Sequence, residues 1–159
     1  MSQENPAALS AASPGSRQQA VLRAYIKNNE LLGTLSVEHQ DNLAAASRLK
    51  QMDEGNYVFH QGDVGKGFFV LCRGAVKVYR TTPDGREAVV KILQAGEIFG
   101  EVMLFKNIPY PANALCLSEV ALIEIDRARL LDMLGDASFR LDFVGILMEK
   151  LQYLIQVSG

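Results

Sequence analysis

The chain has 159 residues, of which 48% are hydrophobic and 21% charged, and this is the composition of an ordinary soluble globular protein. A chain of this length forms one domain with a flanking segment and buries enough surface to fold without a disulfide or a metal. Its formal charge of −2 excludes the strongly basic surface typical of a domain that holds nucleic acid.

The chain carries no sequence signal for a membrane or for secretion. No apolar stretch reaches the ~18 residues needed to span a bilayer, and the first residues lack the charged start and apolar core of a signal peptide. Cys72 and Cys116 lie in apolar runs without C-x-x-C spacing, so they are interpreted as buried packing residues. These features predict a cytoplasmic protein without membrane contacts.

Helices are predicted at the N-terminal side. Residues 1–16 are rich in Ser, Ala and Pro and are predicted to be a disordered tail. Apolar residues at helical spacing predict a helix over 17–29. A second helix is expected to begin after Ser36, which has the character of an N-cap, and to run to about Ser47.

The centre of the chain has the pattern of short β-strands. Apolar runs alternate with glycine-containing turns at roughly 8–12-residue spacing, and the segment 83–85 is a hairpin turn of the Pro-Asp-Gly type. The expected strands cover residues 57–60, 68–72, 75–80, 88–93, 111–117 and 119–126, with a short segment at 97–99 between them. This pattern predicts a mainly β fold, a sandwich or closed jelly roll, with flanking helices.

The last third returns to helix. Asp126 is expected to cap a short helix that ends before Gly135, and a long amphipathic helix is expected over 136–157. Four of its residues follow the spacing of a coiled-coil seam and predict a homodimer interface: Val144, Leu147, Leu151 and Leu154. A neighbouring stripe of Phe139, Phe143 and Ile146 would face the β domain. The alternative is one wide stripe that packs only on its own domain.

A corner between two strands, residues 96–114, carries the candidate site. Gly100 is expected to make a sharp turn into one helical turn, followed by a proline-stiffened return to β structure. A helix N-terminus at such a corner can hold an anion, and Glu101 could accept a ligand hydroxyl. The alternative is a helical corner that binds nothing.

The order of these motifs resembles the cyclic-nucleotide-binding-domain superfamily, and more narrowly the sensor half of Crp/Fnr bacterial transcription regulators. The resemblance covers about residues 30–157 and includes the turn glycines Gly55, Gly62, Gly74 and Gly96, which are expected at positive φ. It implies a double-stranded β-helix, or jelly roll, followed by a dimerisation helix. Residues 96–101 match the start of the phosphate-binding cassette of the family.

One departure from the family pattern concerns the effector. Members that bind cyclic nucleotides carry an arginine near the end of the cassette, which pairs with the cyclic phosphate. This chain offers Tyr110 or Pro111 at that place. Because the loss of such a charge-assisted contact to a buried anion costs roughly 2–5 kcal/mol, cyclic AMP is expected to bind weakly or not at all.

The cassette sequence resembles instead the DNR and HcpR-like branch that responds to nitric oxide and nitrosative stress. That resemblance implies an apolar pocket, with haem as the sensing cofactor. The axial ligand is left open, with His39 and His60 as the weak metal-binding candidates. The predicted effector-binding residues are Phe99, Gly100, Glu101, Met103, Leu104, Tyr110, Pro111, Ala112 and Asn113.

The resulting hypothesis is a sensor unit over 17–135, with a dimerisation helix over 136–159, from a Crp/Fnr-type regulator that responds to a small molecule or a gas. DNA would be contacted only through a helix-turn-helix that this chain does not contain. A cyclic-nucleotide-binding regulatory domain and an interaction domain with an empty pocket are the alternatives. An enzyme is not expected, because the sequence has no nucleophile elbow, P-loop or paired-histidine metal motif.

Overall fold

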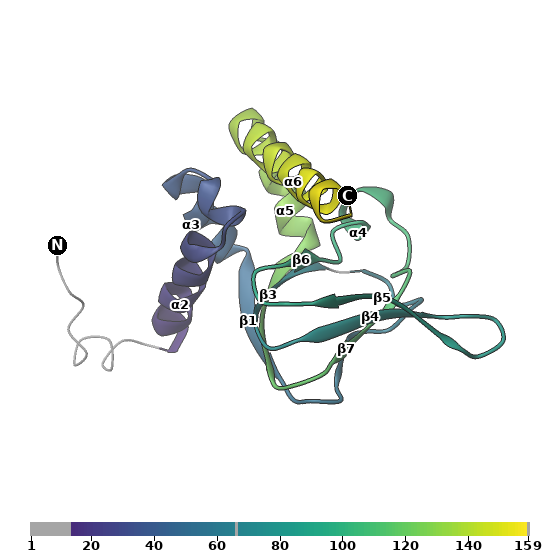
Figure 1. The fold of residues 1–159 in the computed structure, drawn as a ribbon. Coiled ribbons are helices and arrows are strands. Elements are labelled where there is room, and N and C mark those ends of the chain that lie inside the picture. The colour runs from purple at the N-terminus through teal and green to yellow at the C-terminus, as the bar shows by residue number, and fades with distance from the viewer. Residues whose placement is uncertain (1–13, 66, 159) are drawn as a thin grey trace.

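The computed structural model describes residues 14–65 and 67–158, and in this part of the chain three groups of elements follow one another. The helices α2 (Pro14–Asn28) and α3 (Val37–Ala45) come first, separated by the 3-10 turn η1 (Leu32–Thr34). Eight strands and the short helix α4 (Met103–Lys106) form the centre, and α5 (Arg127–Met133) and α6 (Ala137–Ser158) end the chain. Figure 1 shows the helices gathered on one side of the β-structure.

The strands form two four-stranded antiparallel sheets that together make a roll, which confirms the predicted fold class. The first sheet has the order β1-β8-β3-β6 and consists of β1 (Ser47–Met52), β8 (Val120–Asp126), β3 (Gly67–Arg73) and β6 (Ile98–Phe99). The second has the order β2-β7-β4-β5 and consists of β2 (Tyr57–Phe59), β7 (Asn113–Cys116), β4 (Val76–Thr81) and β5 (Glu87–Leu93).

The strands β3 and β8 of the first sheet are buried on both faces, and this explains their continuous apolar runs. Alternate side chains of β3 point to opposite faces. Phe68 and Val70 pack against the helices, whereas Phe69 and Leu71 point into the roll. The strand β5 is mostly exposed and lies at the edge of the second sheet.

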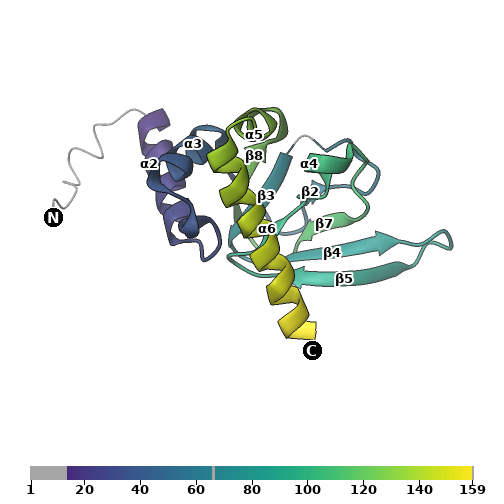
Figure 2. The ribbon, with the colours of Figure 1, turned by 90° about the horizontal axis from the view of Figure 1, so that it is seen from above.

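The helices cover the outer face of the first sheet. In α6, the side chains of Phe139, Phe143 and Ile146 are fully buried against this face, as the neighbouring stripe predicted. Figure 2 shows α6 extending from the α5 end of the roll toward β5. His39 of α3 anchors the start of α6, because its Nδ1 lies 2.8 Å from Asp142 Oδ2 and its ring meets Phe139 edge-on.

Most element boundaries agree with the sequence prediction. The hydroxyl of Ser36 caps α3 by accepting from the N–H of His39, and the carboxylate of Asp126 caps α5 by accepting from the N–H of Arg129. The first helix begins at Pro14, three positions before the expected start. The rest of the predicted tail, residues 1–13, lies outside the described residues.

One strand was not predicted. The sequence pattern extends the second helix to about Ser47, but α3 ends at Ala45 and β1 begins at Ser47. The strand is polar, and Arg48 and Lys50 form ion pairs with Glu124 on β8. These residues form a strand because they pair with β8, since their own sequence has no alternation of apolar and polar residues.

Candidate functional site

The cassette corner runs from β6 through Gly100, α4 and a proline-containing loop into β7. Gly100 has φ of +80°, and a Cβ built on it would touch the rings of Phe69, Phe59 and Tyr110. Asn107 ends α4 in the left-handed region at φ of 40°. The predicted sharp turn and single helical turn are therefore present, and the corner lies against the interior of the roll.

Aromatic rings fill the roll behind this corner. The ring of Tyr110 is stacked on that of Phe59 at a centroid distance of 3.9 Å and an interplanar angle of 9°. Phe69 and Phe99 continue the stack at 5.4 Å, and Phe59 lies 5.8 Å from Phe69. The Tyr110 hydroxyl donates to the carbonyl oxygen of Gly67 at 2.9 Å. These contacts hold the tyrosine ring inside the roll.

Tyr110 and Pro111, the two residues proposed for the place of the family arginine, have different surroundings. Tyr110 is 5% exposed and belongs to the core inside the roll, whereas Pro111 is exposed. The buried polar residues of the described chain include no lysine or arginine. Tyr110 therefore occupies the interior with a neutral ring, and no described cation accompanies it there.

The other predicted effector residues divide among different surroundings. Phe99 and Met103 belong to the core inside the roll, and Leu104 belongs to the core beneath the helices. Ala112 is buried. Asn113 is buried and engaged, because its Oδ1 accepts from the N–H of Gln61 at 2.8 Å and its amide donates to Thr81 Oγ1 at 3.3 Å.

Two cationic side chains reach the cassette from the C-terminal helices. Arg127 of α5 donates to the carbonyl oxygens of Met103 at 3.0 Å and of Leu104 at 3.4 Å. Lys150 of α6 donates to the carbonyl oxygen of Ile98 at 2.6 Å and forms an ion pair with Glu101. Glu101 is therefore bound to α6 rather than turned into the roll.

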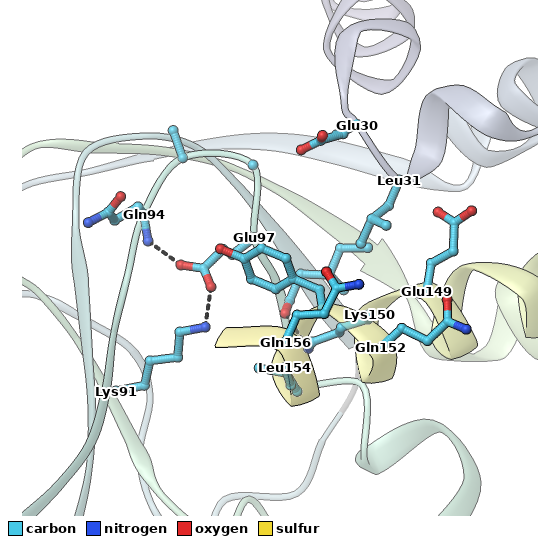
Figure 3. A pocket seen from close by; sticks show the side chains of 14 residues that line it. Glu30, Leu31, Lys91, Gln94, Glu97, Glu149, Lys150, Gln152, Leu154 and Gln156 are labelled. Atoms are coloured by element: carbon cyan, nitrogen blue, oxygen red, sulfur yellow. Dashed lines mark hydrogen bonds and ion pairs between the residues drawn. The ribbon is translucent and has the colours of Figure 1, made fainter. Parts of the chain in front are cut away.

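The two described hollows lie outside the roll, along α6. A groove of about 450 Å³ lies between α6, the β5–β6 turn and the end of α2, and its walls include Glu30, Glu97 and Tyr153. Figure 3 shows Lys91 and Glu97 on one side of this groove and the α6 side chains on the other. A smaller hollow of about 230 Å³ is lined by Glu101, Leu147, Lys150, Leu151 and Leu154.

The two predicted metal-binding histidines are engaged by other side chains. Both ring nitrogens of His39 face carboxylates, with Nδ1 at 2.8 Å from Asp142 and Nε2 at 3.8 Å from Asp136. His60 is exposed and stacks on the ring of Tyr57 at 4.3 Å. Within residues 14–65 and 67–158, no group of three or more His, Cys, Asp or Glu side chains is placed to hold a metal ion.

The two cysteine thiols are held in their neutral form. Burial raises the pKa of the Cys72 thiol to about 11, and burial also raises the pKa of Cys116. Cys116 is buried inside the roll, and Cys72 packs at the edge of the core beneath the helices. Their surroundings agree with the packing role predicted for them.

The long helix carries an apolar stripe that is exposed in the described part of the chain. Of the predicted seam residues, Val144, Leu151 and Leu154 are exposed, whereas Leu147 packs against the core beneath the helices. Further apolar side chains of α6 are exposed beside them: Leu141, Met148 and Ile155. Leu141, Val144, Met148, Leu151 and Ile155 follow the alternating three- and four-residue spacing of a coiled-coil face.

Sequence reasoning missed four residues that shape the corner. Phe59 and Phe69 come from strands far from the cassette in sequence, and Arg127 and Lys150 come from the C-terminal helices. An apolar residue in a strand and a charged residue on a helix are ordinary features of a sequence. Only the fold brings these side chains to the cassette.

The antiparallel roll, its glycine-flanked corner and the helices packed over it define a regulatory domain of the cyclic-nucleotide-binding type. The model of the cyclic nucleotide-binding domain matches residues 49–136, and the chain belongs to this family. The turn glycines predicted on that resemblance all have positive φ. Among the described residues, no helix is long and apolar enough to cross a membrane.

Known relatives support the resemblance to Crp/Fnr sensor domains. The chain is 31% identical over 102 residues to the CRP-like cAMP-activated global transcriptional regulator of Mycobacterium tuberculosis, which covers 63% of this chain and 46% of that protein. It is 32% identical over 108 residues to cGMP-dependent protein kinase 2 of Homo sapiens, which covers 66% of this chain and 14% of that kinase. The chain thus spans less than half the length of these two relatives.

A solved structure is similar over nearly the whole fold. The sensor domain of the transcriptional regulator DNR from Pseudomonas aeruginosa is 31% identical, with a TM-score of 0.71, and the match covers 87% of this chain and 93% of that one. Together with the family match, this similarity confirms the resemblance to a Crp/Fnr-type sensor domain.

Proposed function

We propose that the chain is the effector-sensing and dimerisation part of a Crp/Fnr-type transcription regulator, and that its effector binds at the cassette corner without a phosphate clamp. The observation that carries this proposal is the Tyr110 ring, which is stacked on Phe59 and hydrogen-bonded to Gly67 at the place where family members have an arginine. The domain acts by binding an effector and carries out no chemistry on it.

The surroundings of Tyr110 disfavour a cyclic phosphate. A buried phosphate needs a cation or several N–H donors to offset its desolvation. The side chains around Tyr110 are instead the aromatic rings of the stack, which fill the interior of the roll. Cyclic AMP and cyclic GMP are therefore expected to bind weakly or not at all.

Haem, which the resemblance to nitrosative-stress regulators implies, does not fit the described residues. Its macrocycle would need the space that the stacked rings of Phe59, Phe99 and Tyr110 fill. Its iron would need an axial ligand at the corner, whereas His39 is engaged by Asp142 and His60 lies on the exposed surface. We therefore assign no step of the function to haem and propose a small-molecule effector.

Dimerisation belongs to the same proposal. One stripe of α6 is buried on the first sheet, and the exposed stripe from Leu141 to Ile155 suits the α6 helix of a second copy. A regulator of this type would contact DNA through a helix-turn-helix outside this chain. The effector would act by changing how the two long helices are held.

Calorimetric titration with cyclic AMP and cyclic GMP tests the proposed function. We expect no saturable binding to the wild-type chain at millimolar nucleotide. Tyr110→Arg places a guanidinium at a position proposed for the family arginine and should bind at least about 100-fold more tightly, because a charge-assisted contact contributes roughly 2–5 kcal/mol. The matched control, Tyr153→Arg, adds the same charge on the exposed face of α6 and should behave like the wild type.

The main alternative is a cyclic-nucleotide-binding regulatory domain. The family match and the similarity to a cAMP-activated regulator favour it. Micromolar binding of either nucleotide to the wild-type chain would establish this alternative and overturn our proposal. Titration with haem provides a second comparison, because a stoichiometric Soret band that shifts with nitric oxide would instead support a gas sensor.

A further inference from the structure

The second half of α6 is attached to the roll through a polar contact. Beyond Ile146, no side chain among residues 147–156 is buried, and residues 151–156 are all exposed. In this part of the helix, Lys150 donates to the Ile98 carbonyl oxygen at 2.6 Å and pairs with Glu101. The side chains of Lys150 and Glu101 are only 22% and 20% exposed. This contact links the helix to the cassette.

The atoms that Lys150 contacts belong to the cassette itself. Ile98 lies in β6, and Glu101 follows the Gly100 turn at the start of the corner. The carbonyl oxygen of Ile98 and the carboxylate oxygen of Glu101 are both acceptors, and neither can donate to a ligand while Glu101 is ionised. Glu101 also borders the smaller hollow of about 230 Å³, whose other walls are Leu147, Lys150, Leu151 and Leu154, whereas Ile98 borders the larger groove. The site therefore pairs two acceptors with an apolar wall.

We propose that the Lys150 ammonium is a built-in occupant of the effector's acceptor site, so that an effector that binds Glu101 must release the second half of α6. This inference rests on the proposed function and deepens it. The acceptor pair selects a ligand with hydroxyl or ammonium donors and an apolar body. A ligand that presents a phosphate or a carboxylate at this place meets the like charge of Glu101.

Lys150 is thus a positioning and specificity residue. When the Lys150 ammonium pairs with Glu101, it holds α6 against the cassette. When effector donors take the same oxygens, the second half of α6 keeps only the half-buried Leu147 and exposed side chains against its own roll, and the exposed apolar stripe changes its position relative to a second copy. The energy available for this change is the difference in effector affinity between the two arrangements.

Hydrogen exchange of the α6 amides without any ligand tests the attachment. In Lys150→Met, which keeps an apolar stem but removes the charge, exchange over residues 147–158 should be faster by about fivefold, the size expected for a partly buried ion pair. Glu101→Gln should have a similar effect, and the double variant should add little to either change. Lys150→Arg should restore most of the protection.

Lys91→Met is the matched control, because it removes an ion pair with Glu97 on the side of the larger groove opposite the α6 side chains (Figure 3). It should leave the exchange of residues 147–158 at the wild-type rate. The proposed attachment would be overturned if Lys150→Met exchanged at the wild-type rate. It would also be overturned if the effect of the double variant equalled the sum of the effects of Lys150→Met and Glu101→Gln.

A second measurement tests the ligand chemistry of the site. Lys150→Ala vacates the place of the ammonium, and propylammonium should then bind there with saturable NMR shifts at the backbone of Ile98 and Glu101. Tetramethylammonium, which has no donors, and the variant Lys150→Ala/Glu101→Gln should give none. Equal shifts with both cations, or no saturation with propylammonium, would contradict the assignment. Neither measurement involves a nucleotide, so these failures are distinct from a failure of the proposed function.

Discussion

Tyr110 has a structural role as well as the role assigned to it in effector selection. Its hydroxyl satisfies the Gly67 carbonyl oxygen inside the roll, and its ring covers one face of Phe59. A buried acceptor that loses its donor keeps the full cost of its desolvation. Tyr110 therefore stabilises the roll.

Tyr110→Phe removes only the hydroxyl and should lower the free energy of unfolding by about 1–2 kcal/mol, because the Gly67 carbonyl oxygen is left unpaired. Urea denaturation followed by circular dichroism measures this change. Tyr153→Phe, an exposed position on α6, should change the stability by less than about 0.5 kcal/mol. Equal effects of the two substitutions would show that the buried hydrogen bond contributes nothing.

The partly buried thiol of Cys72 gives a prediction for pH. Its pKa of about 11 keeps the thiol neutral at pH 8, so iodoacetamide should alkylate it about 100-fold more slowly than free cysteine. The rate should rise with pH up to about 11. Because the pKa is raised on folding, the neutral thiol favours the folded state below pH 9, and this advantage is lost as pH rises through about 11.

Cys116→Ser leaves Cys72 as the single thiol, and mass spectrometry of this variant measures its rate directly. The same variant in concentrated urea serves as the reference, since the unfolded thiol should react like free cysteine. Alkylation of the folded protein at pH 8 within a factor of about 10 of that reference would contradict the assigned burial.

At the scale of elements, the turn between β3 and β4 packs directly against the turn between β7 and β8. Gly74 has φ of +93°, and a Cβ at this position would lie 2.3 Å from the carbonyl oxygen of Glu119. The N–H of Ala75 donates to Ser118 Oγ at 3.1 Å in the same place. The backbones of the two turns approach each other too closely for a side chain at residue 74.

Gly74→Ala should therefore destabilise the protein by at least about 2 kcal/mol more than Gly85→Ala. Gly85 is the matched comparison, because it has a similar φ of +84° but no atom within 4 Å of the place that a Cβ would take. Thermal and urea denaturation of both variants measure the difference. Equal losses of stability would mean that backbone strain, rather than the contact with Glu119, sets the cost.

The strands with strong apolar patterns could be predicted from the sequence, whereas β1 and the closure of the site could not. Phe68 to Leu71 form a continuous apolar run because both faces of β3 are buried. The strand β1 has no such signal, since its charged residues pair with Glu124 on a strand far along the chain. A strand defined by its partner carries little local signal.

The candidate site shows the same limit. Sequence spacing predicts the Gly100 turn and the absence of an arginine, because both depend on local residues. Whether Tyr110 lines a cavity or fills it depends on Phe59 and Phe69, which arrive from other strands. The ion pair of Glu101 with Lys150 depends on where α6 crosses the roll. These are properties of the tertiary arrangement.

At the scale of the whole molecule, the two stripes of α6 predict a dimer. Leu151 is 51% exposed and belongs to the exposed apolar stripe. Leu151→Glu should weaken dimerisation by at least about tenfold, because a carboxylate at an apolar interface loses its hydration without a partner. Light scattering across a range of protein concentrations measures the association.

Val37→Glu provides the control for the dimer, because Val37 is 72% exposed on α3, outside the α6 stripe. It should leave the association unchanged. A wild-type chain that remains monomeric at every concentration, or a Leu151→Glu variant that associates normally, would contradict this interface.

The last strand of the roll, β8, is one of the two inner strands of the first sheet. β8 lies between β1 and β3, and Ser47 at the start of β1 opposes Ile125 near the end of β8. During synthesis, the ribosome has to release the chain through Asp126 before either neighbour can pair with this strand. Pairing between such distant segments is slow, and the waiting strands expose unpaired edges. The nascent sensor therefore depends on protection from aggregation until its final strand emerges.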